Sequence, residues 1–341
     1  MVIKIMIHIV NELDEITWRQ YIQSHPHSNI FHTPEMFQVF ARAKGHHPTL
    51  WAAVDNGSRI LALLTPVCIT LLSGPLRSFT TRAVAYGSVL CAPGAEGQAA
   101  LTKLLKVYKG ETKEVPLFTE LRNLVDMSDA QPTLAAAHFV HENHLNYLID
   151  LKRSPEALLQ SFNSSTRKII RRRLSRSDVV IEEANTPGQI AVCYELLRRT
   201  YHAVRVPLPD ISLFQAAFHL LRPCRMLQVL LARVGDTYAS CLLQLVYKDT
   251  IYGWYGGMDR DYASYTPNEM LFWHAFKWGT ENSCCVYDFG GAGKPGEYYG
   301  PREFKSKFGG TLVNFGRNTY IHAPIRLKIS QTGYRFLKRF L

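Results

Sequence analysis

The sequence predicts an α+β protein made of two consecutive mixed units, and three observations lead to this fold class. The 341 residues are enough for roughly two domains of ordinary size. Apolar residues make up 47% of the chain, which is typical of a globular protein with a buried core. Both halves are expected to run through helices, an antiparallel meander, a helix and a further strand, so we expect a structural repeat.

The first unit is expected over residues 1–150. Its first ten residues have the apolar content of a strand, and Asn11 is expected to cap a helix that ends near Ser24. Thr33-Pro34-Glu35 indicates a second helix start, because proline is favoured at the first helical position. Asp55-Asn56-Gly57 is typical of a hairpin turn. The other elements expected here are strands at 48–55, 59–71, 78–91, 116–121 and 145–151 and helices at 95–109 and 129–143.

The second unit is expected over residues 151–324, followed by a basic C-terminal helix over 325–341. Its centre is a run of three strands, at 225–234, 238–248 and 250–258, whose connections are short enough for hairpins. The other elements expected here are helices at 154–162, 164–176, 187–203, 210–221 and 267–281 and strands at 179–184, 284–289 and 311–316.

Composition limits the class of protein further. No apolar run reaches the roughly 18 residues of a membrane helix, and the N-terminus lacks the pattern of a signal peptide. The seven cysteines are scattered without a Cys-x-x-Cys pair, which favours a reducing, cytoplasmic location over a disulfide framework or a zinc ribbon. The net charge of +11 indicates an anionic partner, such as a nucleic acid, a nucleotide, a phosphorylated precursor or a lipid surface.

The most distinctive stretch runs from Val286 to Gly310. We expect a short strand, a loop with several glycines, and a close on two lysines between Phe304 and Phe308. Glycine lets a backbone approach a ligand closely, and the lysines indicate an anion or a developing negative charge. The spacing Gly291-x-Gly293-x-x-Gly296 fits the dinucleotide fingerprint by letter only, because a proline interrupts it and too little chain follows for a Rossmann domain.

A second distinctive stretch is the basic helix expected at 164–176. Its cations are Arg167, Lys168, Arg171, Arg172, Arg173 and Arg176. Arg167 and Arg171 share a face by their spacing of four, and guanidinium groups hold phosphate in two-point contact. A merely solvated face is an alternative of equal weight.

Three further patterns have a structural and a functional interpretation. His138, His141 and His144 are spaced for one helix face, but a solvated helix end is preferred and no metal site is expected. Tyr255 and Gly256 end an aromatic strand that is either a packing point or one wall of a cleft. The C-terminal segment is basic and amphipathic, so an anionic membrane surface is an alternative to ordinary packing.

Four segments together resemble the FemAB/FemX family of peptidoglycan bridge-forming aminoacyltransferases, and more closely its shorter relatives in exopolysaccharide gene clusters and the cellulose-linked acetyltransferases. The segments are Tyr255-Gly256-Gly257, Thr266-Pro267-Asn268-Glu269-Met270-Leu271, Tyr287-Asp288-Phe289-Gly290-Gly291 and Phe304-Lys305-x-x-Phe308-Gly309. The match is good over 150–320 and looser before it. The resemblance implies two tandem GNAT-like domains of the acyl-CoA N-acyltransferase fold, with mixed central sheets flanked by helices and the active cleft in the second.

The resemblance also implies the chemistry and its residues. Acyl transfer to an amine or hydroxyl passes through a tetrahedral oxyanion, which the ammonium of Lys305 would stabilise with Phe304 beside it. Arg167 and Arg171 would hold a phosphate-bearing substrate. The other substrate-binding residues that the resemblance implies are Tyr255, Gly256, Asn268, Glu269, Asp288, Gly290, Gly291 and Arg302.

The donor stays open between acyl-CoA and aminoacyl-tRNA, and no tightly bound cofactor is expected. No heptad-rich arm for tRNA is evident, and residues 261–267 lack the glycines of the usual pyrophosphate loop. The expected acceptor is a phosphorylated small molecule or a lipid-linked precursor of the cell envelope or of an exopolysaccharide. Two other classes remain: a nucleic-acid-binding protein that uses residues 164–176, and a peripheral protein held at the inner membrane surface by residues 325–341.

Overall fold

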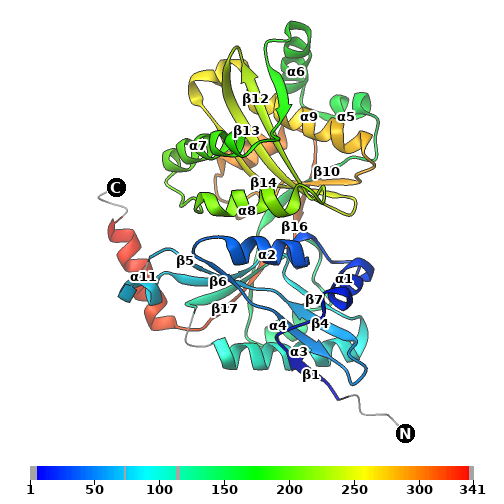
Figure 1. Cartoon of the computed structure of the whole chain (residues 1–341), viewed down its shortest axis with the longest axis vertical. Helices are drawn as coiled ribbons and strands as arrows, with labels where there is room; N and C mark the ends of the chain where they lie inside the picture. The colour runs from blue at the N-terminus through cyan, green and yellow to red at the C-terminus, as the bar shows by residue number, and fades with distance from the viewer. Residues whose placement is uncertain (1–5, 73, 113–115, 338–341) are drawn as a thin grey trace. The chain divides into compact units, whose positions relative to one another are not determined.

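The computed structural model describes residues 6–72, 74–112 and 116–337, and the chain forms two compact units (Figure 1). The first unit contains Met1–Asn143 and Phe315–Leu341, and the second contains His144–Asn314. Each is a mixed α+β unit, as the sequence predicts. The boundaries differ from those expected at 150 and 324, because the strand Leu145–Asp150 pairs within the second sheet and the chain then returns to the first unit.

The first unit has two sheets. One has the strand order β1-β3-β4-β7, and the other has the order β2-β5-β6-β8-β17-β9, in which β6 and β8 are parallel. The strands are β1 (His8–Val10), β2 (His46–Pro48), β3 (Trp51–Val54), β4 (Ile60–Leu64), β5 (Val67–Thr70), β6 (Thr81–Ala85), β7 (Val89–Cys91), β8 (Phe118–Arg122), β9 (Val140–Glu142) and β17 (Arg317–Ile321). The helices are α1 (Glu15–Ser24), α2 (Pro34–Arg42), α3 (Gly94–Thr112), α4 (Gln131–Ala136) and α11 (Pro324–Leu337), with 3₁₀ turns η1 (Ile30–His32) and η2 (Gly74–Phe79).

Three expectations for the first unit are corrected. Asp14, and not Asn11, caps α1, because its carboxylate accepts the Thr17 N–H at 2.9 Å. The helix expected at 129–143 is the short α4 followed by β9, and His138 between them has a positive φ of 63°. The three histidines therefore share no helix face, and the described residues contain no group of His, Cys, Asp or Glu that could hold a metal.

The second unit has one sheet with the order β11-β12-β13-β14-β15-β10-β16, in which only β14 and β15 are parallel. The expected meander β12-β13-β14 is present. The strands are β10 (Leu145–Asp150), β11 (Val180–Glu183), β12 (Leu227–Val234), β13 (Thr237–Tyr247), β14 (Thr250–Met258), β15 (Val286–Asp288) and β16 (Thr311–Asn314). The helices are α5 (Pro155–Ser161), α6 (Ser164–Arg176), α7 (Pro187–Ala203), α8 (Ile211–Leu221), α9 (Pro267–Glu281) and α10 (Gly300–Ser306), with the 3₁₀ turn η3 (Arg260–Tyr265).

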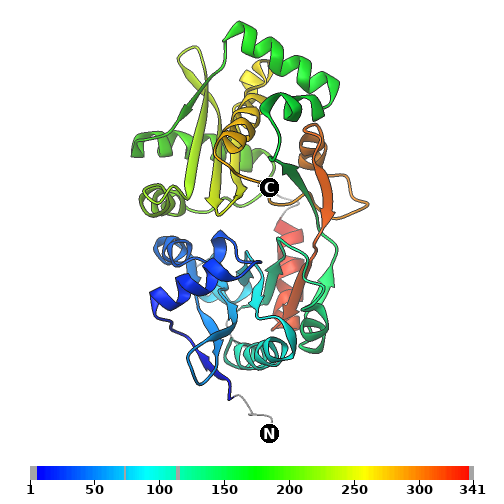
Figure 2. The ribbon, with the colours of Figure 1, turned by 90° about the vertical axis from the view of Figure 1, so that its right-hand side faces the viewer.

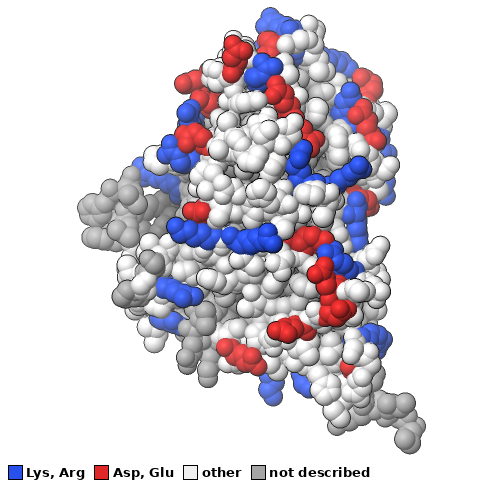
Figure 3. Space-filling view, viewed as in Figure 1, with Lys and Arg blue, Asp and Glu red and all other residues white. Residues whose placement is uncertain are grey.

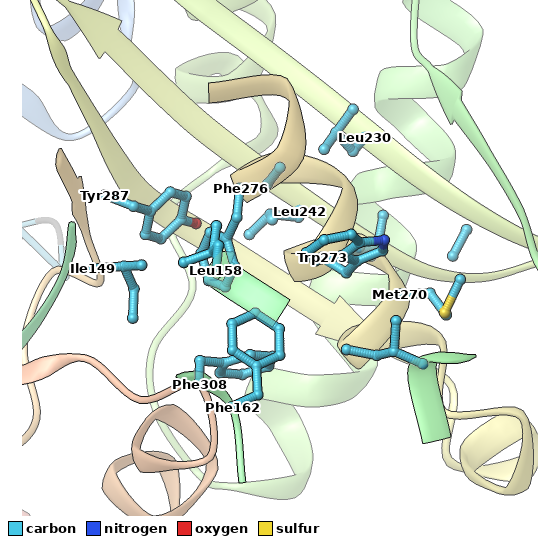
Figure 4. Close-up of a cluster of buried hydrophobic side chains, with 14 of the residues drawn as sticks. Ile149, Leu158, Phe162, Leu230, Leu242, Met270, Trp273, Phe276, Tyr287 and Phe308 are labelled. Atoms are coloured by element: carbon cyan, nitrogen blue, oxygen red, sulfur yellow. The ribbon is translucent and has the colours of Figure 1, made fainter. Parts of the chain in front are cut away.

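The core of the second unit lies between α9 and the sheet (Figure 4). Phe276 of α9 and Phe308 after α10 are fully buried, with ring centroids 5.4 Å apart. Phe162, which follows α5, meets Phe308 edge to face at 5.3 Å. Figure 2 shows α10 (orange) beside α5, and Gly309 after α10 closely approaches the Ser161 carbonyl at the end of α5. The short helix α10, which the sequence did not predict, is therefore anchored by Phe308.

Candidate active site

The parallel strands β14 and β15 separate at the site. β14 has nine residues, but only Thr250–Tyr252 pair with β15, opposite Val286–Asp288. Gly253 stands where the strands part, and a Cβ there would lie 2.9 Å from the Tyr287 hydroxyl oxygen. A bulge between β13 and β14 falls at the same level and bends the strand further. Beyond this fork, the free edge of β14 has no strand partner among the described residues.

Asp288 ends β15 and is 4% exposed. Its Oδ1 accepts hydrogen bonds from the Gly290 N–H at 2.6 Å and from Asn146 Nδ2 at 2.7 Å. Burial raises the pKa of this carboxyl, and the two hydrogen bonds and the charge of Lys305 oppose that rise. No described residue donates a hydrogen bond to its Oδ2.

Asn146 connects β10 to the loop. Its Oδ1 accepts the Gly291 N–H at 2.9 Å while its Nδ2 holds Asp288. The sequence analysis placed Asn146 within the strand expected at 145–151 and missed this role. A buried asparagine within a strand is unusual and is the local signal available. Its position beside Asp288 follows only from the pairing of β10 with β15.

Lys305 approaches the same loop from α10. Its Nζ donates to the Phe289 carbonyl oxygen at 2.8 Å and to the Gly291 carbonyl oxygen, and it lies 5.5 Å from the centre of the Phe289 ring. Burial lowers the pKa of Lys305 to about 8, and the negative charge of Asp288 opposes that shift. An ammonium has three N–H donors. Two are held by carbonyls, and the third has no acceptor among the described residues.

Two glycines in the loop have conformations that require them. Gly290 has φ 76° and Gly291 has φ 128°, both in the region that L side chains rarely adopt. A Cβ at Gly290 would lie 2.8 Å from the Gly253 carbonyl oxygen on β14. The two glycines therefore let the loop turn against β14 and direct the carbonyls of 289 and 291 to Lys305.

Arg302 and Phe304 support this arrangement from α10. Arg302 donates from Nε to the Ala292 carbonyl oxygen at 2.7 Å, from Nη1 to that of Glu297 at 2.9 Å, and from Nη2 to that of Lys294. Its donors face the loop backbone, so in this structure it braces the loop. Phe304 packs on Phe272 with ring centroids 5.5 Å apart, which holds the helix turn that carries Lys305.

The two residues expected at the start of α9 have partners within the protein. The Glu269 carboxylate, 13% exposed, lies 3.8 Å from Lys307 Nζ. The Asn268 side chain contacts the hydroxyl of the fully buried Ser240. Both help to attach α9 to its neighbours.

Tyr255 and Gly256 lie on the free part of β14. The Tyr255 ring packs edge to face on Phe214 of α8 at 4.9 Å and lies 5.9 Å from Tyr201 of α7. Gly256 pairs with Leu242 of β13. Tyr255 is therefore part of an aromatic cluster with Phe214 and Tyr201, beyond the fork.

The cations of α6 do not gather at Lys305. Arg167 donates to the Gln160 carbonyl oxygen at 2.8 Å, and Arg171 pairs with Glu156 of α5 at 3.0 Å. Arg173 is buried against Asp178 at 2.6 Å and lies over the Tyr265 ring at 5.3 Å. Lys168, Arg172 and Arg176 are exposed. The structure thus brings together Lys305, Asp288, Gly290 and Gly291. Arg167 and Arg171 of α6 instead contact α5.

Comparisons with known proteins find similar folds. Residues 164–306 match the family model described as an acetyltransferase (GNAT) domain. The crystal structure of FemX is similar with 17% identity and a TM-score of 0.71, covering 95% of this chain and 100% of that one. A comparison with curated protein sequences finds no match.

Two further solved structures are similar over most of both chains. A tandem GNAT protein from the clavulanic acid biosynthesis pathway has 12% identity and a TM-score of 0.59, covering 93% of this chain and 99% of that one. The C-terminal domain of a putative lysylphosphatidylglycerol synthetase from Agrobacterium fabrum has 12% identity and a TM-score of 0.55, with coverages of 92% and 93%. The tandem GNAT fold that the sequence predicts is confirmed.

Proposed function

We propose that this chain, which has a tandem GNAT fold and whose residues 164–306 match an acetyltransferase (GNAT) domain, acylates an amine or hydroxyl of a cell-envelope or exopolysaccharide precursor. One observation carries the proposal. The Lys305 ammonium is held by two backbone carbonyls at the fork of β14 and β15, with its third donor available. A fixed positive charge of this kind stabilises a tetrahedral oxyanion without reorganising during the reaction.

The proposed reaction uses two side chains. The acceptor nitrogen or oxygen attacks the acyl carbonyl carbon, whose oxygen takes the negative charge beside Lys305. The bond to the leaving group of the donor then breaks, and the acceptor's proton leaves with that group or to solvent. Asp288, whose Oδ2 accepts no hydrogen bond from the described residues, binds the acceptor's N–H or O–H and orients its lone pair.

The acceptor is proposed to carry a phosphate, free or lipid-linked. The positive charge of the chain supports this, as does the phospholipid in the name of one protein of the same fold, a putative lysylphosphatidylglycerol synthetase. Of the two expected phosphate ligands, Arg171 is better placed than Arg167, because half of its side chain is exposed. Its ion pair with Glu156 is exposed as well, and such pairs exchange readily.

The donor is proposed to be an acyl-CoA, with aminoacyl-tRNA as the alternative. The match of residues 164–306 to an acetyltransferase domain supports the acyl-CoA. The experiment offers each donor in turn with phosphorylated and lipid-linked precursors and detects the product by mass spectrometry. A product heavier by one acyl group, absent with Lys305→Met, supports the proposal. Lack of a product with every pair, or equal product from Lys305→Met, contradicts it.

The second candidate is non-catalytic nucleic-acid binding, which the exposed cations Lys168, Arg172 and Arg176 favour. Against it, basic and acidic side chains are interspersed over the face of the chain in Figure 3. This candidate predicts that the chain binds duplex DNA or tRNA and that the affinity falls steeply with added salt. It also predicts that replacement of these three cations weakens the binding. Loss of binding already at physiological salt would remove it.

A further inference from the structure

Six exposed aliphatic side chains gather in two neighbouring segments of the first unit. We call them the apolar patch: Leu71, Leu72, Leu76, Ile321, Ile325 and Ile329. All are between 48% and 77% exposed. The leucines lie in or just before η2, and the isoleucines lie at the end of β17 and on α11, which packs beside η2 (Figure 1). Exposed aliphatic residues are usually scattered singly, so such a group indicates an interaction surface.

The patch includes the outward face of α11. Ile325 and Ile329 are one helix turn apart and exposed, together with Lys328 between them. Leu327 and Ser330, on the other side, are half-buried and face the protein. The helix therefore packs on the protein through a narrow inner face, and Ile325 and Ile329 form a second apolar stripe that is exposed.

The two segments that carry the patch have charges of one sign. Residues 315–337 of the first unit contain no Asp or Glu and four Lys or Arg. The segment 71–82 also lacks acids and contains Arg77 and Arg82. Apolar side chains in segments that carry cations and no acids are complementary to a surface that offers both hydrocarbon and negative charge. An anionic phospholipid bilayer is such a surface.

We propose that the apolar patch and its basic surroundings dock the first unit onto an anionic phospholipid bilayer. The contact is peripheral, since no helix among the described residues has the length and apolar content to span a membrane. A nucleic acid offers no hydrocarbon for six aliphatic side chains. A second copy of this chain would bring two faces of the same positive charge together. The inference goes beyond acyl transfer and does not depend on it.

The test is co-sedimentation of the full chain with vesicles, without any acyl donor or acceptor. Mixed phosphatidylglycerol–phosphatidylcholine vesicles should bind the protein, and pure phosphatidylcholine vesicles should bind it much less. Each Lys or Arg near an anionic bilayer contributes about a fivefold gain in partitioning, so added salt should weaken the binding. Absence of binding to the mixed vesicles overturns the proposal.

Variants separate the patch from general positive charge. Ile325→Asp should lower the partition coefficient about tenfold or more, because it removes a buried aliphatic group and adds a charge of the wrong sign. Leu76→Asp tests the η2 half in the same way. Ile16→Asp is the matched control, since Ile16 is 66% exposed on α1 of the same unit and lies outside the patch. Circular dichroism spectra and thermal unfolding curves like those of the wild type show that each variant is folded.

The other outcomes are also decisive. Equal binding by wild type, Ile325→Asp and Leu76→Asp means that charge alone attracts the chain and overturns the apolar contact. Equal losses in Ile325→Asp and Ile16→Asp overturn it as well. If the wild type ignores vesicles but forms dimers that Ile325→Asp abolishes, the patch is an interface between copies and the bilayer proposal is wrong.

Discussion

Lys305 has an environment that suits a positively charged catalytic group. It is close to carbonyl dipoles and an aromatic face, and its nearest carboxylate, Asp288, forms no ion pair with it among the described contacts. A tight ion pair would neutralise the charge that the oxyanion needs. The carbonyls instead fix the ammonium in place and leave its charge largely uncompensated.

Replacing this ammonium tests its role. Lys305→Met should lower kcat by about 10²–10³, the usual effect of losing one oxyanion donor, while the fold is retained. Lys277→Met is the matched control, because Lys277 is exposed on α9 and forms its ion pair with Glu281, at 3.7 Å. Steady-state kinetics and thermal unfolding of both variants check the prediction. A Lys305→Met enzyme with near-normal kcat would show that the ammonium does not act on the reacting atoms.

The pH dependence follows from the same side chain. Its lowered pKa of about 8 means that the ammonium is mostly present below pH 8 and is lost above it. After correction for ionisation of the acceptor, kcat should be level below that pH and fall about tenfold per pH unit above it. Single-turnover rates across this range measure the effect. In Lys305→Arg the descending limb should disappear from this range, because a guanidinium stays charged. If kcat of Lys305→Arg still falls above pH 8, the fall is caused by the titration of another group.

At the scale of elements, the loop after β15 is positioned by contacts on three sides. Asn146 holds it from β10, Arg302 braces it from α10, and Gly290 lies against β14. The loop is thus a shaped backbone surface whose carbonyls set the position of the lysine. Its glycines serve this geometry and not a dinucleotide.

Two glycines in this loop form a matched pair for testing the contact with β14. Gly290 and Gly296 both have φ 76°, but a Cβ at 290 would meet the Gly253 carbonyl oxygen and a Cβ at 296 would meet open space. Gly296→Ala should cost about 1 kcal/mol of backbone strain, and Gly290→Ala about 2–3 kcal/mol or more, because the clash adds to it. Urea unfolding measures both. Equal costs would mean that the loop moves freely away from β14.

At the scale of the whole molecule, the end of the chain is part of the first unit. β17 pairs with β8 and β9, and its Asn318 is fully buried in a polar network with Asn123 and Gln131. Removal of residues 315–341 should therefore unfold part of the first unit. Point substitutions, and not truncation, are for this reason the better tests of the apolar patch.

This dependence can be measured by hydrogen exchange. Deletion of 315–341 should remove protection from β8 and β9 and leave that of the second-unit strands β12 and β13 unchanged, because stability is lost in local cooperative units. Deletion of 324–341, which retains β17, should leave β8 protected. If β8 exchanges equally fast in both deletions, α11 and not β17 stabilises this edge of the sheet.

The sequence alone determined much of this protein. Local patterns placed the meander, the α9 start and the basic helix correctly, because caps, turns and hydrophobic periodicity act over a few residues. The choice of Asp288 and Lys305 as site residues came from a family resemblance. In the structure both contact the backbone of the loop after β15, and their role in the reaction remains a prediction.

Only the tertiary structure decided the rest. It brought Asn146 from β10 to Asp288, turned Arg302 toward the loop backbone, and returned β17 to the first unit. It also joined η2 to α11, which adds the exposed side chains of Leu71, Leu72 and Leu76 to those of the C-terminal segment. These contacts depend on strand pairing and packing between residues far apart in the chain. Local propensity depends on neighbouring residues and contains no information about which distant strands pair. These contacts therefore could not be predicted from local sequence patterns.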